Sequence, residues 1–176
     1  MANPSTSNSS QSAFDLLGLP PRFDLDPQAI ESAFFERSKE LHADKFATAP
    51  AAERVAALSK SRALNDAYLA IKKPVPRAEY LLARAGVAIG DNERLDPAFL
   101  MEILELREEL AEARAAGKLD LVERLQGTMK TRRAAAVGAL PPLFAANDLP
   151  AIKEKLIVLR YLNRYLEECD AALDED

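Results

Sequence analysis

Apolar residues recur every three to four positions along most of the chain, the spacing that places side chains on one face of an α-helix. Over residues 27–41, one side of the predicted helix carries Ile30, Ala33, Phe34 and Leu41. The pattern begins with Asp26-Pro27, a capping residue followed by a proline at the first helical position. It therefore predicts a helix that begins at residue 27 and ends near residue 41.

A longer helix is predicted over residues 50–73, and the prolines at positions 74 and 76 should end it. Its apolar content comes from Val55, Leu58, Leu64, Tyr68, Leu69 and Ile71. Two shorter helices are predicted over residues 12–17 and 78–84. Gly18 and a proline pair should end the first of them.

The second half of the chain predicts three helices, over residues 97–116, 119–137 and from 147 or 148 to 173. Asp96-Pro97 repeats the cap-plus-proline signal, while Gly117 and Gly138 follow the first two helices. Short turns between long helices are typical of an antiparallel three-helix bundle. With no alternating strand pattern and no repeat, the sequence predicts an all-α fold.

The first bundle helix has two apolar faces on a helical wheel. A narrow core stripe is formed by Phe99, Ile103, Leu106 and Leu110. The opposite side carries Leu100, Met101, Leu104, Glu105, Glu108 and Glu112. Apolar groups ringed by carboxylates indicate a protein-binding surface for a partner with basic residues at its edge. The alternative is a helix that lies between two others and buries both sides.

The last helix has the same ambiguity. Leu156, Leu159 and Leu166 form one stripe, and Ile157, Tyr161 and Tyr165 lie across from it.

Composition excludes several classes of function. The net charge of −5 over 176 residues argues against a nucleic-acid-binding surface. One cysteine and one histidine cannot form a disulfide or a His/Cys metal site within one chain, and we expect no metal and no cofactor. No apolar run approaches the roughly 20 residues of a membrane helix. Residues 1–12 are rich in Ser and Asn and predict a disordered tail, not a signal peptide. The cytoplasm is therefore the expected location.

The only histidine, His42, lies in a polar turn between the first two long helices. Such a turn displays its side chains outward, which indicates a contact point for a partner. A histidine near an aspartate also suggests general-base catalysis. However, the chain has no nucleophile elbow, glycine-rich phosphate loop or metal-ligand cluster, and we do not expect an enzyme. A helical assembly factor without a chaperone partner is the third hypothesis.

The loop His-Ala-Asp-Lys-Phe, residues 42–46, resembles the His-Pro-Asp loop of a J domain. The runs from Leu64 to Tyr68 and from Arg77 to Leu82 resemble the later part of J domains in the HscB family. The run from Phe99 to Leu110 resembles the C-terminal signature of that family. The resemblance implies a J domain over residues 13–85 and a scaffold-binding bundle over 96–176. Composition places a disordered tail over residues 1–12 before them and a linker over 86–95 between them.

Membership of this family implies a co-chaperone of iron–sulfur cluster assembly. Its J domain would dock on an HscA/DnaK-type ATPase chaperone and stimulate ATP hydrolysis, and its bundle would bind the cluster scaffold IscU. The matching chaperone-binding positions are His42, Ala43, Asp44, Lys45, Lys39 and Arg37. The matching scaffold-binding positions are Leu100, Met101, Leu104, Glu105, Glu108, Glu112 and Tyr161.

The chain departs from the family motif at Ala43, where the family has proline. Alanine keeps His42 and Asp44 but lets the turn adopt more backbone conformations. Two hypotheses therefore stay open. Either the J domain stimulates its chaperone with alanine in place, or the chain is a scaffold binder with a weakened or inactive J domain.

Overall fold

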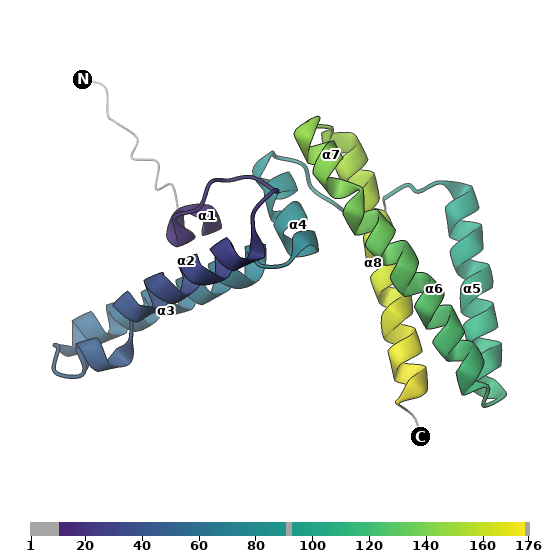
Figure 1. Ribbon diagram of the computed structural model, residues 1–176, viewed down its shortest axis with the longest axis horizontal. Coiled ribbons are helices and arrows are strands. Elements are labelled where there is room, and N and C mark those ends of the chain that lie inside the picture. Colours follow the sequence, from purple (N-terminus) through teal and green to yellow (C-terminus); the bar gives the residue numbers. More distant parts are fainter. Residues whose placement is uncertain (1–10, 91–92, 175–176) are drawn as a thin grey trace. The chain divides into compact units, whose positions relative to one another are not determined.

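The computed structural model of the protein describes residues 11–90 and 93–174, and every regular element within them is a helix (Figure 1). The predicted tail lies outside these residues except for positions 11 and 12, as does part of the predicted linker. The chain divides into two compact units, Met1–Leu81 and Leu82–Asp176. The division falls inside a helix, a few residues before the predicted end of the first domain.

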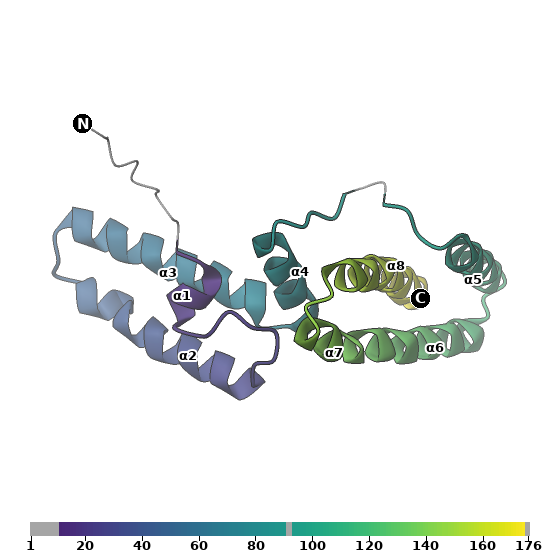
Figure 2. The ribbon, with the colours of Figure 1, turned by 90° about the horizontal axis from the view of Figure 1, so that it is seen from above.

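The first unit is built around an antiparallel helical hairpin. Its elements are α1 (Ala13–Leu17), α2 (Pro27–Glu40), the 3-10 turn η1 (Ala43–Phe46), α3 (Ala51–Ile71) and the start of α4 (Pro74–Arg84). Helices α2 and α3 lie side by side, and η1 closes the turn between them (Figure 2). The side chain of Asp26 accepts a hydrogen bond from the Gln28 N–H at 3.0 Å, as the capping signal predicted.

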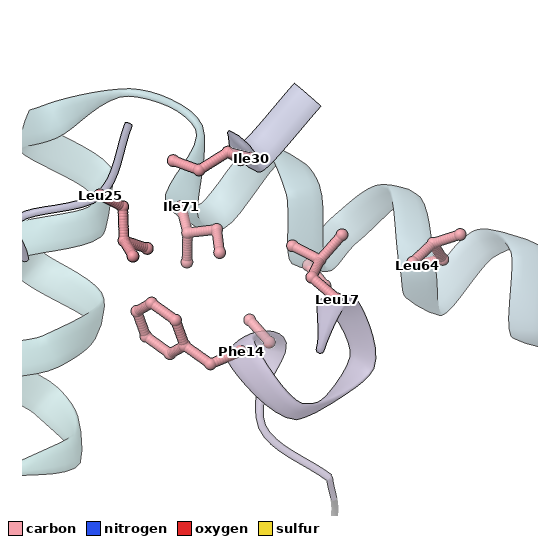
Figure 3. Packing of buried hydrophobic residues seen from close by; sticks show 8 residues of the cluster. Phe14, Leu17, Leu25, Ile30, Leu64 and Ile71 are labelled. Carbon is pink, nitrogen blue, oxygen red and sulfur yellow. The ribbon is translucent and has the colours of Figure 1, made fainter. Parts of the chain in front are cut away.

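The core of this unit gathers where α1 packs against the hairpin. Figure 3 shows Phe14 and Leu17 of α1 pointing towards Ile30 of α2 and towards Leu64 and Ile71 of α3. The η1 turn lies at the other end of the hairpin from Ile30 and Ile71, which follow the start of α2 and end α3. The core therefore holds the base of the hairpin together and leaves its tip free to make contacts.

Helix α4 begins at Pro74, earlier than the predicted position 78. Prolines are tolerated in the first helical turn because the N–H groups there have no acceptor within the helix. Sequence analysis also missed the role of Arg77, which is buried. Its Nη1 donates to the Ile71 carbonyl at 2.9 Å, and its guanidinium lies 5.1 Å from the centre of the Phe23 ring. These contacts anchor α4 to the end of α3.

The second unit contains α5 (Pro97–Ala115), α6 (Leu119–Gly138), α7 (Leu140–Ala145) and α8 (Leu149–Leu173). The three long helices agree with the prediction, but α7 was missed. Its proline pair was taken as a helix end, whereas Pro141 stands in the first turn of a new helix. The chain reverses into α8 at Asn147, which has a φ of 52°.

Helices α6 and α8 form the densest contact of the bundle, and α5 packs along both of them. Ile103 and Leu110 turn inward from α5 and are 2% and 5% exposed. Ion pairs then join α5 to its neighbours, Glu102 to Arg132 on α6 and Arg107 to Glu168 on α8. Helix α8 buries residues from both of its apolar stripes, which settles its ambiguity in favour of a central helix: Ile152, Leu156, Ile157, Leu159, Leu162, Tyr165, Cys169 and Ala172.

Candidate functional site

The tip of the hairpin presents His42 and Asp44 to solvent, with side chains 64% and 89% exposed. His42 precedes η1 and caps it, because its Nδ1 accepts a hydrogen bond from the Asp44 N–H at 3.3 Å. The same nitrogen lies 3.2 Å from Oδ2 of Asp44. The two side chains are thus held together by contacts within the loop and are open to a partner.

The Nδ1 atom of His42 serves these two contacts in different protonation states. It accepts the backbone N–H when it carries a lone pair, and it donates to the carboxylate when it carries a proton. The exposed Asp44 carboxylate keeps lone pairs available to a partner. The arrangement suits recognition of a partner's hydrogen-bond donors.

Ala43 is the first residue of η1, and His42 before it has φ −62° and ψ 136°. An extended residue followed by the first position of a helix is the backbone that an X-Pro pair adopts. The loop therefore has a conformation in which proline would fit at position 43. Alanine at this position lacks the constraint that a proline ring would impose on the backbone.

The three basic side chains predicted for this surface lie in different surroundings. Lys45 is exposed in η1, and Lys39 is exposed and paired with Glu36 at 2.6 Å. Arg37 instead reaches back to the end of α1, where its Nη2 would clash with a Cβ added to Gly18. Of the three, only Lys45 belongs to the η1 turn itself.

A groove of about 430 Å³ lies beside the loop, and sequence analysis did not identify it. Its apolar walls come from Leu41, Ala43, Phe46, Ala57 and Leu58. Leu58 lies on α3, within the hairpin itself, and is 66% exposed. The sequence shows that Leu58 is an apolar residue of this helix, but the groove forms only because η1 packs against α3.

Helix α5 presents the second candidate surface. Met101 and Leu104 are 58% and 53% exposed, whereas their neighbour Ile103 is buried. The three carboxylates of the predicted face are exposed and Leu100 is half-buried. On the predicted core stripe, Ile103 and Leu110 are buried, while Phe99 and Leu106 are only half-buried. The interpretation of a helix with both sides buried is therefore wrong.

Tyr161 of α8 lies at the seam between α8 and α5, where it contacts Phe99 of the predicted core stripe. Its ring meets the ring of Phe99 edge-on, with the centroids 6.0 Å apart and the planes at 84°. One turn along α8, the hydroxyl of Tyr165 donates to the Leu106 carbonyl at 3.1 Å. Tyr161 is therefore half-buried beside the N-terminal part of α5. A binding site formed by both helices would need it in this position.

Within the part of the chain that the structure describes, no group of three or more His, Cys, Asp or Glu residues could hold a metal ion. The described helices include none that is long and apolar enough to cross a membrane. Cys169 is fully buried in α8, and burial raises the pKa of its thiol to about 11. A buried protonated thiol is a poor nucleophile and metal ligand.

Comparison with known proteins finds similarity to one family of co-chaperones. The family model described as "HSCB C-terminal oligomerisation domain" matches residues 95–170. The chain is 37% identical over 167 residues to the co-chaperone protein HscB homolog of Azoarcus sp. (strain BH72), covering 93% of this chain and 94% of the relative. It is 50% identical over 101 residues to the HscB homolog of Vibrio vulnificus, covering 56% of this chain and 59% of the relative.

Two solved structures have the same fold. The chaperone HscB from Vibrio cholerae aligns with a TM-score of 0.80 and 31% identity, over 93% of this chain and 98% of that one. The human co-chaperone protein HscB aligns with a TM-score of 0.83 and 24% identity, over 93% and 83% of the two chains. The predicted fold class, an all-α J domain followed by a helical bundle, is confirmed.

Proposed function

Since this chain belongs to the HscB family of co-chaperones, we propose that it binds an IscU-type scaffold through α5 and Tyr161 and presents it to an HscA/DnaK-type chaperone. The His42 loop would then stimulate the ATPase of that chaperone. In this proposal the protein itself catalyses no reaction and holds no cofactor. The iron–sulfur cluster is the cargo of the scaffold.

The single observation that carries the scaffold-binding part is the exposure of Met101 and Leu104 on a helix whose other side is buried. An exposed apolar pair costs solubility unless a partner covers it. Exposed carboxylates at positions 105, 108 and 112 surround the pair and would meet basic groups of the scaffold. Tyr161 extends the surface across the seam to α8, and such rims around apolar centres are typical of binding interfaces.

The chaperone-binding part is supported by the His42 loop. Its imidazole and carboxylate are exposed at the tip of a hairpin whose core lies at the opposite end. Lys45 is the basic side chain of that turn, and the adjacent groove offers apolar contacts. A partner could therefore combine charged and apolar contacts over one small area.

The alternative is a helical assembly factor that binds the scaffold but has a weakened or inactive J domain. Ala43 is the observation that favours it, because alanine leaves the loop without the restriction that a proline ring imposes. The backbone at His42 already has the conformation that proline would select. Stimulation of the ATPase then depends on how much of the time the free loop spends in this conformation.

Scaffold binding can be measured by isothermal titration of the purified IscU-type scaffold into this protein. We expect Leu104→Ala and Met101→Ala to weaken binding at least tenfold while the helical circular-dichroism signal is retained, because truncated interface anchors commonly cost more than 1 kcal/mol. Val55→Ala is a matched control, since Val55 is an apolar residue of the other unit that is also more than half exposed. Unchanged binding by both α5 variants would refute this part of the proposal.

The chaperone function can be measured as steady-state ATPase activity of the HscA-type chaperone with the scaffold present. The parent chain, Ala43→Pro and Asp44→Asn should be compared. Stimulation by the parent that Asp44→Asn abolishes supports the co-chaperone function as proposed. Stimulation by Ala43→Pro alone supports the alternative of a weakened J domain. If neither the parent chain nor Ala43→Pro stimulates the ATPase, the chaperone-binding part is wrong.

A further inference from the structure

A hollow of about 130 Å³ lies beside Tyr161, between α8 and the segment that precedes α5, and it shares Tyr161 with the proposed scaffold-binding surface. Ile157, Ile89 and Tyr161 supply its apolar lining, and Arg164 also lines it. Arg160, Glu93 and Gly90 complete the lining. The hydrogen bond from Lys153, then that from the Gly90 N–H, and to a smaller extent the charge of Arg160 lower the pKa of Glu93. Such a hollow has room for one side chain of a partner.

The position of Arg164 follows from the register of α8 against α5. Ile157, Tyr161, Arg164 and Glu168 fall within about 60° of one another on α8 at 100° per residue. Tyr161 contacts Phe99, and Glu168 pairs with Arg107 at 3.0 Å. Arg164 therefore lies along the seam between these two contacts. On α5, Leu104 likewise lies between the two contact residues Phe99 and Arg107.

Among the residues that the structure describes, Arg164 has no partner, unlike several other cations of the bundle. Arg107, Arg132 and Lys153 are each paired with a glutamate. Within residues 11–90 and 93–174, by contrast, no hydrogen bond or ion pair engages the exposed guanidinium of Arg164. An arginine fork with all its donors available is suited to bidentate binding of a carboxylate.

We propose that Arg164 binds an acidic side chain of the scaffold, whose carboxylate seats beside Tyr161 when the apolar face of α5 is covered. This inference rests on the proposed function and adds the chemistry of the partner. The surface is then bipolar, with carboxylates at Glu105, Glu108 and Glu112 along one edge and Arg164 across the seam. A partner docked in reverse would place like charges together, so Arg164 contributes to a single docking orientation.

The test uses full-length Arg164→Glu, Arg164→Gln and Arg164→Lys, titrated with the purified IscU-type scaffold at about 50 mM and about 500 mM salt. We expect Arg164→Glu to weaken binding about tenfold at low salt and clearly less at high salt, because screening reduces both attraction and repulsion. Arg164→Gln should weaken binding less than the charge reversal. Arg164→Lys should fall between Gln and the parent, because lysine retains the charge but not the planar fork.

The matched control is Arg124→Glu, which makes the same change in net charge at an exposed site on α6. Arg124 makes an exposed pair with the Asp120 carboxylate at 3.8 Å and a hydrogen bond from its Nε to the Asp120 carbonyl at 3.4 Å. The loss of such exposed contacts within one helix turn costs little. Binding by Arg124→Glu should equal that of the parent. Thermal unfolding should be the same for all four variants, since each replaces an exposed side chain.

Equal binding by Arg164→Glu and Arg124→Glu would overturn the inference. If Leu104→Ala still weakened binding in that case, the proposed function would stand without it. If Leu104→Ala had no effect, the proposed function would fail on its own account. A loss by Arg164→Glu that persisted undiminished at high salt would also overturn the inference, because it would not arise from charge.

Discussion

The hydroxyl of Tyr165 on α8 donates a hydrogen bond to the carbonyl oxygen of Leu106 on α5, across 3.1 Å. The Tyr165 side chain is fully buried, so this bond joins the proposed scaffold-binding helix to the centre of the bundle. A carbonyl inside a helix already accepts one bond from its own helix and has a second lone pair to offer. The tyrosine uses that second lone pair.

We expect Tyr165→Phe to lower the free energy of unfolding by about 1 kcal/mol, because it removes one buried hydrogen bond and leaves the ring packed. Urea unfolding followed by circular dichroism measures this change. Scaffold affinity should stay within twofold of the parent, since Met101 and Leu104 keep their positions. A Tyr165→Phe protein as stable as the parent would show that the hydrogen bond contributes nothing to stability.

Neighbouring residues on α5 should respond to truncation in opposite ways. Ile103 is buried, so Ile103→Ala should destabilise the protein by about 2–5 kcal/mol. Leu104 is half exposed, so Leu104→Ala should change stability by less than about 1 kcal/mol and act on scaffold binding instead. Thermal unfolding and titration of the same two variants separate these effects. Equal destabilisation by both would contradict the two-faced description of α5.

Ala43→Pro should stabilise the protein by about 0.4–1 kcal/mol, because it restricts the unfolded chain at a position where the folded backbone already suits proline. His42 has the extended conformation required before proline, and residue 43 begins η1. The change is measured by thermal unfolding of the two chains. Ala47→Pro is a suitable control, because the Ala47 N–H donates to the Asp44 carbonyl at 3.4 Å and proline would remove that donor.

Gly18 ends α1 with a φ of +68°, and the Arg37 guanidinium occupies the space where a Cβ would lie. We expect Gly18→Ala to cost about 1–2 kcal/mol from the left-handed backbone alone, with a further cost for displacing Arg37. In the Gly18→Ala, Arg37→Ala double variant the clash is removed but the backbone strain remains. Its stability should therefore exceed the value expected by adding the two single effects, measured by urea unfolding.

Stability should fall as the pH becomes alkaline. Burial raises the pKa of the Cys169 thiol to about 11 from its usual value of 9.0, and burial also raises the pKa of the Tyr165 hydroxyl. The folded protein thus holds protons that the unfolded chain has already lost. The resulting stability is fully present below about pH 9 and is lost as the pH rises through about 11.

Urea midpoints between pH 7 and pH 11 measure this loss. Cys169→Ala should show a shallower decline over the same range, because it removes one of the two raised groups and leaves Tyr165. A midpoint that rose between pH 9 and pH 11 would contradict the prediction. A parallel decline in the parent and in Cys169→Ala would exclude the thiol as a cause.

The sequence by itself determined the long helices. Capping residues such as Asp26 and Asp96 satisfy free N–H groups locally, and helical periodicity depends only on spacing along the chain, so both signals can be followed in the printed sequence. The exposed apolar face of α5 was also predictable, because Leu100, Met101 and Leu104 share one side of the wheel with three glutamates. The J-domain loop could also be identified from the sequence, because its residues 42–46 are consecutive in the chain.

Only the tertiary structure decided the remaining features. Whether Phe99 and Leu106 are buried depends on how closely α8 approaches α5, and Arg37 turns towards Gly18 because α1 packs against the hairpin. The prolines of α4 and α7 begin helices because the following residues find a core to pack on. The position of Arg164 along the seam follows from the contacts that Tyr161 and Glu168 make with α5. These features depend on contacts between residues far apart in the chain, which spacing along one helix does not encode.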